Sequence, residues 1–100
     1  MIYVTQLVYL VPGQEKVFDE FEAVAIPIIA KYHGRLLFRV RPDHKAFIQY
    51  MGEKPYEIHL VEFDSEHDLE NFKKDEERKK FVHLKEMSIK ESVMILGNRL

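Results

Sequence analysis

Hydrophobic and polar residues alternate most regularly over residues 55–63, and this alternation predicts a β-strand. One face of the strand is apolar and consists of Tyr56, Ile58 and Leu60. The other face is mixed and consists of Glu57, His59, Val61 and Phe63. Such a pattern is typical of a central strand in a sheet that helices cover on one side only.

Three further stretches are predicted as strands. Residues 2–10 are rich in β-branched and aromatic residues on both faces, so we expect both faces to be covered. Residues 35–41 alternate, and residues 92–96 form an apolar run that ends at Gly97. In residues 35–41 the inward set is expected to be Leu36, Phe38 and Val40. The outward set is expected to be Arg35, Arg39 and Arg41, with Leu37 interrupting the row.

Residues 42–54 separate two of these strands, and their course is less regular. Residues 42–45 are predicted as a loop and residues 51–54 as a turn. Residues 46–50 between them are predicted either as a short extra strand or as part of a long hairpin.

Apolar residues recur every three or four positions over residues 14–32, which predicts an amphipathic helix. Its polar face is expected to carry Glu15, Lys16, Asp19, Glu20 and Glu22. Pro27 should bend this helix near residues 24–25, and Gly34 suits the left-handed position after its end. Ser65 with Asp68 suits a capping box at the start of a short second helix, and Asp75 begins another.

The predicted order of elements is strand, helix, strand, strand, helix, strand. This order is the split βαββαβ motif of a ferredoxin-like α+β sandwich with an antiparallel sheet, formed by residues 1–100 as a single domain. Two helical segments on one side leave the other sheet face uncovered, and an apolar face of that size needs cover. We expect that face to carry Leu7, Val61, Phe63, Met94 and Leu96. A second copy of the chain is the simplest cover, which predicts a homodimer through the open sheet face.

Several of these features occur together in a known group of proteins. They are the mid-helix Pro27, the helix end at residues 32–34, the strand with Arg39, and the strand and short helix of residues 57–72. In these features nearly the whole chain resembles the dimeric α/β-barrel superfamily, and most closely the bacterial family called domain of unknown function 1330. The resemblance implies a homodimer whose two sheets pack face to face as a barrel. It also implies a pocket between the sheet and the helices or at the dimer interface. It implies no particular reaction, because none is settled for that family.

Composition and charge narrow the function classes. A net charge of −2 gives no reason to expect nucleic acid or an anionic membrane as a partner. The basic run of residues 78–80 follows three acidic residues and is interpreted as a solvated helix face. The absence of cysteine, of a signal-peptide pattern and of a long apolar run leads us to expect a cytoplasmic location. No glycine-rich phosphate loop is present, and no cofactor is predicted.

The strongest candidate catalytic group is Glu57, His59 and Arg39. Neighbouring strands would bring Arg39 close to the other two, with His59 as a general base and Arg39 as a holder of a carboxylate or an oxyanion. The same residues also fit a cross-strand ion pair beside a structural histidine, and structural ion pairs are the more common kind. Glu57 and His59 supply only two metal ligands, whereas a catalytic zinc typically needs three, so no metal is predicted.

Two functions are therefore compatible with the sequence. The first is an uncharacterised homodimeric domain that binds a small molecule. The alternative is a cofactor-independent enzyme, monooxygenase-like or isomerase-like, acting on a small aromatic or carboxylate-bearing substrate. The two differ in whether His59 and Arg39 converge on a closed cavity, because catalysis needs positioned groups and excluded water.

Overall fold

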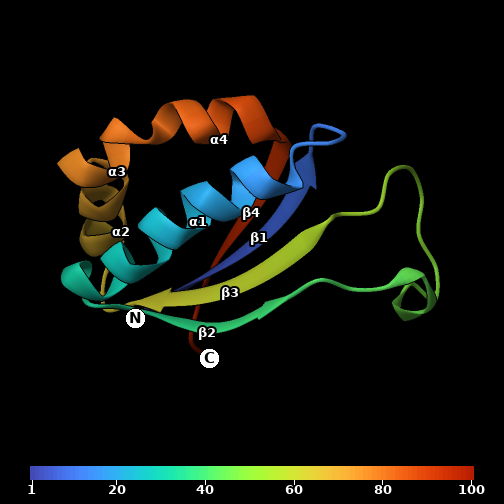
Figure 1. Cartoon of the computed structure of the whole chain (residues 1–100). Helices are drawn as coiled ribbons and strands as arrows, with labels where there is room; N and C mark the ends of the chain where they lie inside the picture. Colours follow the sequence, from blue (N-terminus) through green and yellow to red (C-terminus); the bar gives the residue numbers. More distant parts are fainter.

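The computed structural model describes residues 1–100, and its elements follow the predicted order (Figure 1). The strands are β1 (Ile2–Leu10), β2 (Gly34–Val40), β3 (Glu57–Phe63) and β4 (Ile89–Asn98). The helices are α1 (Glu15–Ile29), α2 (Glu66–Lys73), α3 (Glu76–Lys80) and α4 (Val82–Ser88), with short 3-10 turns η1 (Ala30–Tyr32) and η2 (His44–Ala46). The strands pair antiparallel in the order β2-β3-β1-β4, so the ferredoxin-like α+β fold is confirmed.

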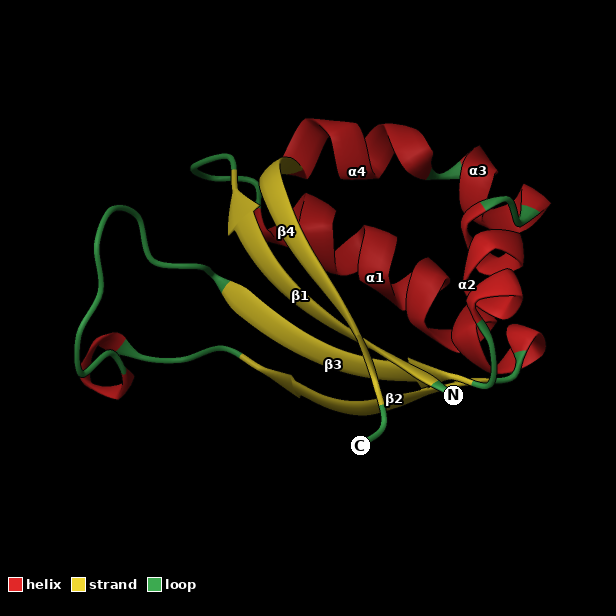
Figure 2. Ribbon diagram, turned by 180° about the vertical axis from the view of Figure 1, so that it is seen from behind, coloured by secondary structure: helices red, strands yellow, loops and turns green.

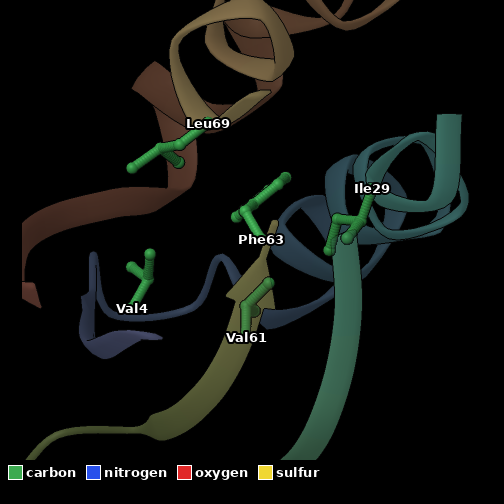
Figure 3. Close-up of a cluster of buried hydrophobic side chains, with 5 residues drawn as sticks. All are labelled: Val4, Ile29, Val61, Phe63 and Leu69. Carbon is green, nitrogen blue, oxygen red and sulfur yellow. The ribbon is translucent and has the colours of Figure 1, made fainter. Parts of the chain in front are cut away.

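All four α-helices lie on one face of the sheet, with α1 and α4 side by side and α2 and α3 at one end (Figures 1 and 2). The main hydrophobic core lies between that face and the helices and consists of Val4, Ile29, Val61, Phe63 and Leu69 (Figure 3). A smaller core of Val8, Leu10 and Phe18 lies near the start of α1. No helix is long and apolar enough to cross a bilayer.

The expected assignment of the two sheet faces is wrong for four of five residues. Val61 and Phe63 are buried under the helices. Met94 pairs with Gln6 and Leu96 with Val4, so these two also lie on the helix-covered face. Only Leu7 lies on the open face. The error arose because Glu57 and His59 share a face with Val61, and a face with polar residues was taken to be the outer one.

The open face is nevertheless largely apolar. It holds Tyr3, Leu7, Tyr9, Phe38, Val40, Ile58, Leu60, Val93 and Ile95. Phe38 is 47% exposed and Ile95 56% exposed, so nothing in this chain covers them. Strand β1 is therefore covered by helices on one face only, and the expectation of cover on both faces is wrong for the single chain.

A β-bulge in β2 changes which residues face the helices. Leu36 pairs with Val61 and Phe38 with Leu60, so Leu37 is an extra residue without a partner. The extra residue reverses the alternation after Leu36. Phe38 and Val40, expected inward, therefore lie on the open face, and Arg39, expected outward, lies under the helices. Arg35 precedes the bulge and remains on the open face, where it pairs with Glu62 and Asp64.

The ends of the helices mostly follow the sequence signals. Ser65 accepts a hydrogen bond from the Asp68 N–H, and Asp75 accepts one from the Arg78 N–H, so both predicted starts are confirmed. The left-handed residue after α1 and η1 is His33 (φ 59°), not Gly34 as expected. Gly34 meets a different need, because a Cβ there would lie 2.6 Å from the ring of Phe63.

The segment between β2 and β3 extends away from the sheet in both views (Figures 1 and 2). Residues 46–50 form no strand, and the only regular element there is η2, which Asp43 caps. The last strand is longer than expected and runs from Ile89 to Asn98, directly after α4.

Candidate functional site

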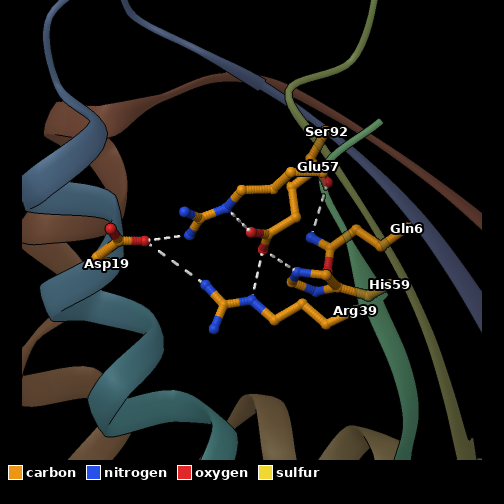
Figure 4. A network of polar contacts seen from close by, with 7 residues as sticks. Gln6, Asp19, Arg39, Glu57, His59 and Ser92 are labelled. Carbon is orange, nitrogen blue, oxygen red and sulfur yellow. Dashed lines mark hydrogen bonds and ion pairs between the residues drawn. The ribbon is translucent and has the colours of Figure 1, made fainter. Parts of the chain in front are cut away.

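The three residues singled out in the sequence do come together, in a buried ionic network at the start of β3 (Figure 4). Glu57 has no exposed surface. Its carboxylate accepts hydrogen bonds from Arg39 Nε at 2.8 Å and Arg41 Nε at 2.7 Å, and it contacts Nε2 of His59. Asp19 on α1 bridges the two arginines from the other side. The bulge at Leu37 makes this network possible, because it turns Arg39 toward the helices.

Glu57 is ionised at neutral pH. Burial alone would raise the pKa of Glu57, but hydrogen bonds from His59, Arg39 and Arg41 outweigh burial and lower the pKa to about 2. A carboxylate that keeps its charge at neutral pH is suited to holding the imidazole in place and less suited to exchanging protons itself.

His59 lies between this network and a cavity of about 70 Å³ enclosed by the sheet and the helices. Its Nε2 contacts Glu57, while Nδ1 makes no hydrogen bond within the chain. Arg39 and Glu57 do not line the cavity but form, with Arg41, a shallow depression open to solvent. Of the three candidate residues, only His59 reaches the enclosed space.

Most of the cavity wall is apolar. Its apolar side chains come from β1, α1, β3, α2 and the α4–β4 corner and include Phe21, Ala25, Ile29, Val61, Phe63, Phe72 and Met94. Its polar side chains are Gln6, Glu22, His59, Arg78 and Lys85. A concave, apolar wall with a few polar groups is the usual composition of a small-molecule site.

Four of these five polar residues were missed in the sequence, namely Gln6, Glu22, Arg78 and Lys85. Glu22 was placed on the solvent face of α1, although it follows Phe18 by four residues and precedes Ala25 by three, the spacing of the buried stripe. It is only 7% exposed, and burial raises the pKa of its carboxyl. The sequence offered this spacing as a signal, but an acidic residue on a buried stripe is rare enough to be overlooked.

Arg78 and Lys85 were missed for a different reason. Arg78 belongs to a basic run that was interpreted as a solvated face, yet its side chain turns inward between two aromatic rings. Burial lowers the pKa of Lys85, and the neighbouring positive charge of Arg78 lowers it further. Their inward direction depends on how α3 and α4 fold back over the sheet, for which the sequence has no local signal.

A second hollow adjoins the cavity where α2, α4 and β4 meet. It shares Gln6, Leu69, Phe72, Arg78, Lys85 and Met94 with the cavity and adds Lys73 and Ser92. Gln6 donates a hydrogen bond to Ser92 at 3.0 Å across this hollow. The hollow therefore connects the cavity to the surface beside three cationic side chains. No group of three His, Asp or Glu side chains is arranged to hold a metal ion.

No protein-family model matches the chain, and no curated protein matches it in sequence. Solved structures do share its fold. Protein RPA0582 from Rhodopseudomonas palustris, of unknown function, superposes with a TM-score of 0.83 at 15% identity, over 99% of this chain and 82% of that protein. An uncharacterised NIPSNAP domain protein from Burkholderia xenovorans gives 0.73 at 11% identity, over 100% and 95% of the two chains.

A third neighbour, from Bacteroides fragilis, is described as a dimeric protein of unknown function with a ferredoxin-like fold. It gives a TM-score of 0.71 at 13% identity, over 98% of this chain and 95% of that protein. At such identities the comparisons establish the ferredoxin-like fold alone.

Proposed function

We propose that this protein is a homodimeric small-molecule-binding domain of the dimeric α/β-barrel type, with its ligand site in the cavity between sheet and helices. The observation that carries the proposal is the cavity itself, which has an apolar wall and a cluster of polar side chains at one side. A tightly packed core has few voids larger than a water molecule. The cavity has space for about five water-sized groups in the centre of this domain. A ligand site explains such a void better than imperfect packing of the core does.

The open face of the sheet supports the homodimer. Nine large apolar or aromatic side chains from all four strands share that face, among them Phe38, Leu60 and Ile95. A second copy related by a two-fold axis could bury this face, because the same apolar surface of each subunit would then pack against the other. The Bacteroides neighbour is described as dimeric. The resemblance to domain of unknown function 1330 favours the same assembly, and the cytoplasmic location stays a prediction.

Filling the cavity tests the ligand site. Ala25 lies on its wall and is 5% exposed, whereas Ala23 lies on the solvent side of the same helix. We expect Ala25→Leu to abolish the saturation-transfer NMR signals of those members of a neutral, anionic and cationic fragment library that bind the native protein. Ala23→Leu is the matched control and should leave those signals unchanged. If no fragment binds the native protein, or if binding survives Ala25→Leu, the cavity is not the site.

The enzyme hypothesis is favoured by one specific observation. His59 presents Nδ1, free of hydrogen bonds within the chain, beside the cavity, while the buried Glu57 carboxylate orients the ring through Nε2. This is the arrangement of a general base and its orienting carboxylate. We propose His59 as the base of this alternative, with Glu57 and Arg39 as positioning residues. Arg39 already serves two carboxylates, so it would hold an incoming anion only by giving one up.

Turnover separates the two hypotheses. A bound fragment that changes chemically in the presence of the native protein, and stays intact with His59→Gln while still binding, would establish the enzyme. Unchanged fragments with both proteins would leave a binding domain.

A further inference from the structure

The guanidinium of Arg78 is held in a fixed position beside the cavity. Its central carbon lies 5.1 Å from the ring centre of Phe72 and 5.7 Å from that of Phe21. Nη1 donates to the carbonyl oxygen of Lys73 at 3.4 Å. Two aromatic rings and one carbonyl therefore fix the plane of the guanidinium, which reduces the entropy lost when it binds a further group.

One edge of this guanidinium has no partner in the chain. Nε of Arg78 is fully buried without a hydrogen bond, and Nη2 makes none either. A buried N–H without an acceptor has lost its hydrogen bonds to water without replacement, so such a group needs an explanation. The edge made by Nε and Nη2 is the one that binds a carboxylate with two parallel hydrogen bonds.

Three arginines in and directly after β2 show how this chain treats the same edge. Each donates from Nε to a glutamate: Arg35 to Glu62 at 2.6 Å, Arg39 to Glu57 at 2.8 Å and Arg41 to Glu57 at 2.7 Å. Arg78 makes no such bond, although its Nε is buried.

The nearest acids do not fill this role. Asp75 uses its carboxylate on the backbone N–H of Arg78, on Tyr32 and on Lys31. Glu22 lies on the cavity wall but makes no hydrogen bond to Arg78. The acceptor that Arg35, Arg39 and Arg41 find within the chain is therefore missing at Arg78.

The surroundings of Arg78 favour an anion. Lys85 lies on the same wall, and Lys73 joins both cations in the hollow that leads from the cavity to the surface. Glu22 is the single carboxyl group on the cavity wall, against two cations. Apart from these groups, Gln6 and His59, the wall is apolar, so the rest of the ligand should be largely apolar as well.

We infer that the ligand is a small apolar monocarboxylate, its carboxylate bound side-on by Nε and Nη2 of Arg78 with Lys85 nearby, and its apolar part in the cavity. This inference rests on the proposed function, because it assigns a ligand class to the same cavity. Entry is through the hollow between α2, α4 and β4, where the cationic side chains attract the anion.

Acid and amide pairs of the same shape test the inference. Benzoate with benzamide, and phenylacetate with phenylacetamide, are titrated into the native protein at neutral pH by isothermal calorimetry. We expect each acid to bind about tenfold more tightly than its amide, because charge-assisted hydrogen bonds to a buried guanidinium are available to the acid alone. Arg78→Met keeps the apolar stem and the capping N–H, and it should reduce this difference to less than about twofold.

Two further variants complete the design. Arg78→Lys keeps the charge without the side-on edge, so its preference for the acid should fall between those of the native protein and Arg78→Met. Lys80→Met removes an exposed cation from the same helix, and the preference should stay at the native value. A loss of preference in Lys80→Met equal to that in Arg78→Met would overturn the role of Arg78.

The outcomes distinguish the ligand class from the ligand site. Equal binding of acid and amide to the native protein would overturn the monocarboxylate while leaving the cavity as a binding site. Failure of these four compounds and of the whole fragment library would overturn the proposed function as well. If Arg78→Met does not fold, the Nε–Hε resonance of Arg78 in the native protein decides the question. It should shift on addition of benzoate and stay in place with benzamide, and no shift with benzoate would contradict the inference.

Discussion

At the scale of single residues, the most unusual group is an ionised glutamate without exposed surface. Glu57 keeps its charge because two guanidinium groups and the His59 ring surround its carboxylate. Removing one partner from a buried ion network leaves the others uncompensated, which costs more than the network contributes in net terms. The stability of the protein and the position of His59 therefore both depend on the side chain of Glu57.

Acid should unfold the native protein partly through Glu57. Its pKa in the folded protein is about 2, below the ordinary value of 4.5. The contribution of this group to stability is therefore complete above about pH 4.5 and is lost as the pH falls toward 2. Between pH 6 and pH 3 we expect the native free energy of unfolding, measured with urea, to fall about 2 kcal/mol more than that of Glu57→Gln.

Glu57→Gln should also lower stability at pH 6 by about 3–5 kcal/mol, because its arginines and histidine lose their counter-charge. Glu20→Gln on the exposed side of α1 is the control and should show the native pH dependence. A Glu57→Gln protein with the same loss on acidification as the native protein would mean that Glu57 is not the group titrating in this range.

At the scale of elements, the sequence was most informative where a pattern is local. Helical and strand periods located all four strands and the helical segments, and Ser65 and Asp75 marked two helix starts correctly. The faces of β2 could not be assigned, because the single extra residue at Leu37 reverses the alternation after Leu36 and has no signature of its own. The faces of β3 were interchanged because Glu57 and His59 were taken to mark the outer side. The sequence correctly grouped the candidate residues Glu57, His59 and Arg39. It gave no sign of the inward-facing cations Arg78 and Lys85, because their direction depends on how α3 and α4 fold over the sheet.

The junction between η1 and β2 gives a test of such an element-scale difference. Gly34 was expected for its backbone freedom, but the structure explains it by close packing, since a Cβ would lie 2.6 Å from the ring of Phe63. We expect Gly34→Ala to lower the free energy of unfolding by about 1–3 kcal/mol, through overpacking. Gly97→Ala is the control, because a Cβ there meets no atom within 4 Å.

A second variant separates the contact with Phe63 from the contact with Ile29. In a Phe63→Leu background the ring is gone, so the added cost of Gly34→Ala should shrink clearly in a double-mutant cycle. An unchanged cost in that background would mean that Ile29, whose Cγ2 would lie 2.7 Å from the added Cβ, sets the cost instead of Phe63.

At the scale of the whole molecule, the two faces of one strand should respond differently to a new charge. Leu60 lies on the open face opposite Thr5 and Phe38, while its neighbour Val61 lies in the core under the helices. If two sheets pack face to face, Leu60→Glu places two carboxylates in an apolar interface, which is unfavourable. We expect Leu60→Glu to sediment as a folded monomer, with the circular dichroism of the native protein.

Val61→Glu should instead lower the free energy of unfolding by several kcal/mol, because its carboxylate would be buried in the core of the monomer without a partner. Ala23→Glu on the exposed side of α1 is the control for an added charge, and it should remain a stable dimer. A native dimer of Leu60→Glu would mean that the open sheet face is not the interface, and another partner would then have to cover Phe38 and Ile95. Monomers in both Leu60→Glu and Ala23→Glu would show that net charge, and not the sheet face, controls assembly. We therefore expect a new charge on the open face to dissociate the dimer, one in the core to unfold the protein, and one on the helix surface to do neither. Only a dimer through the sheet explains these three results together.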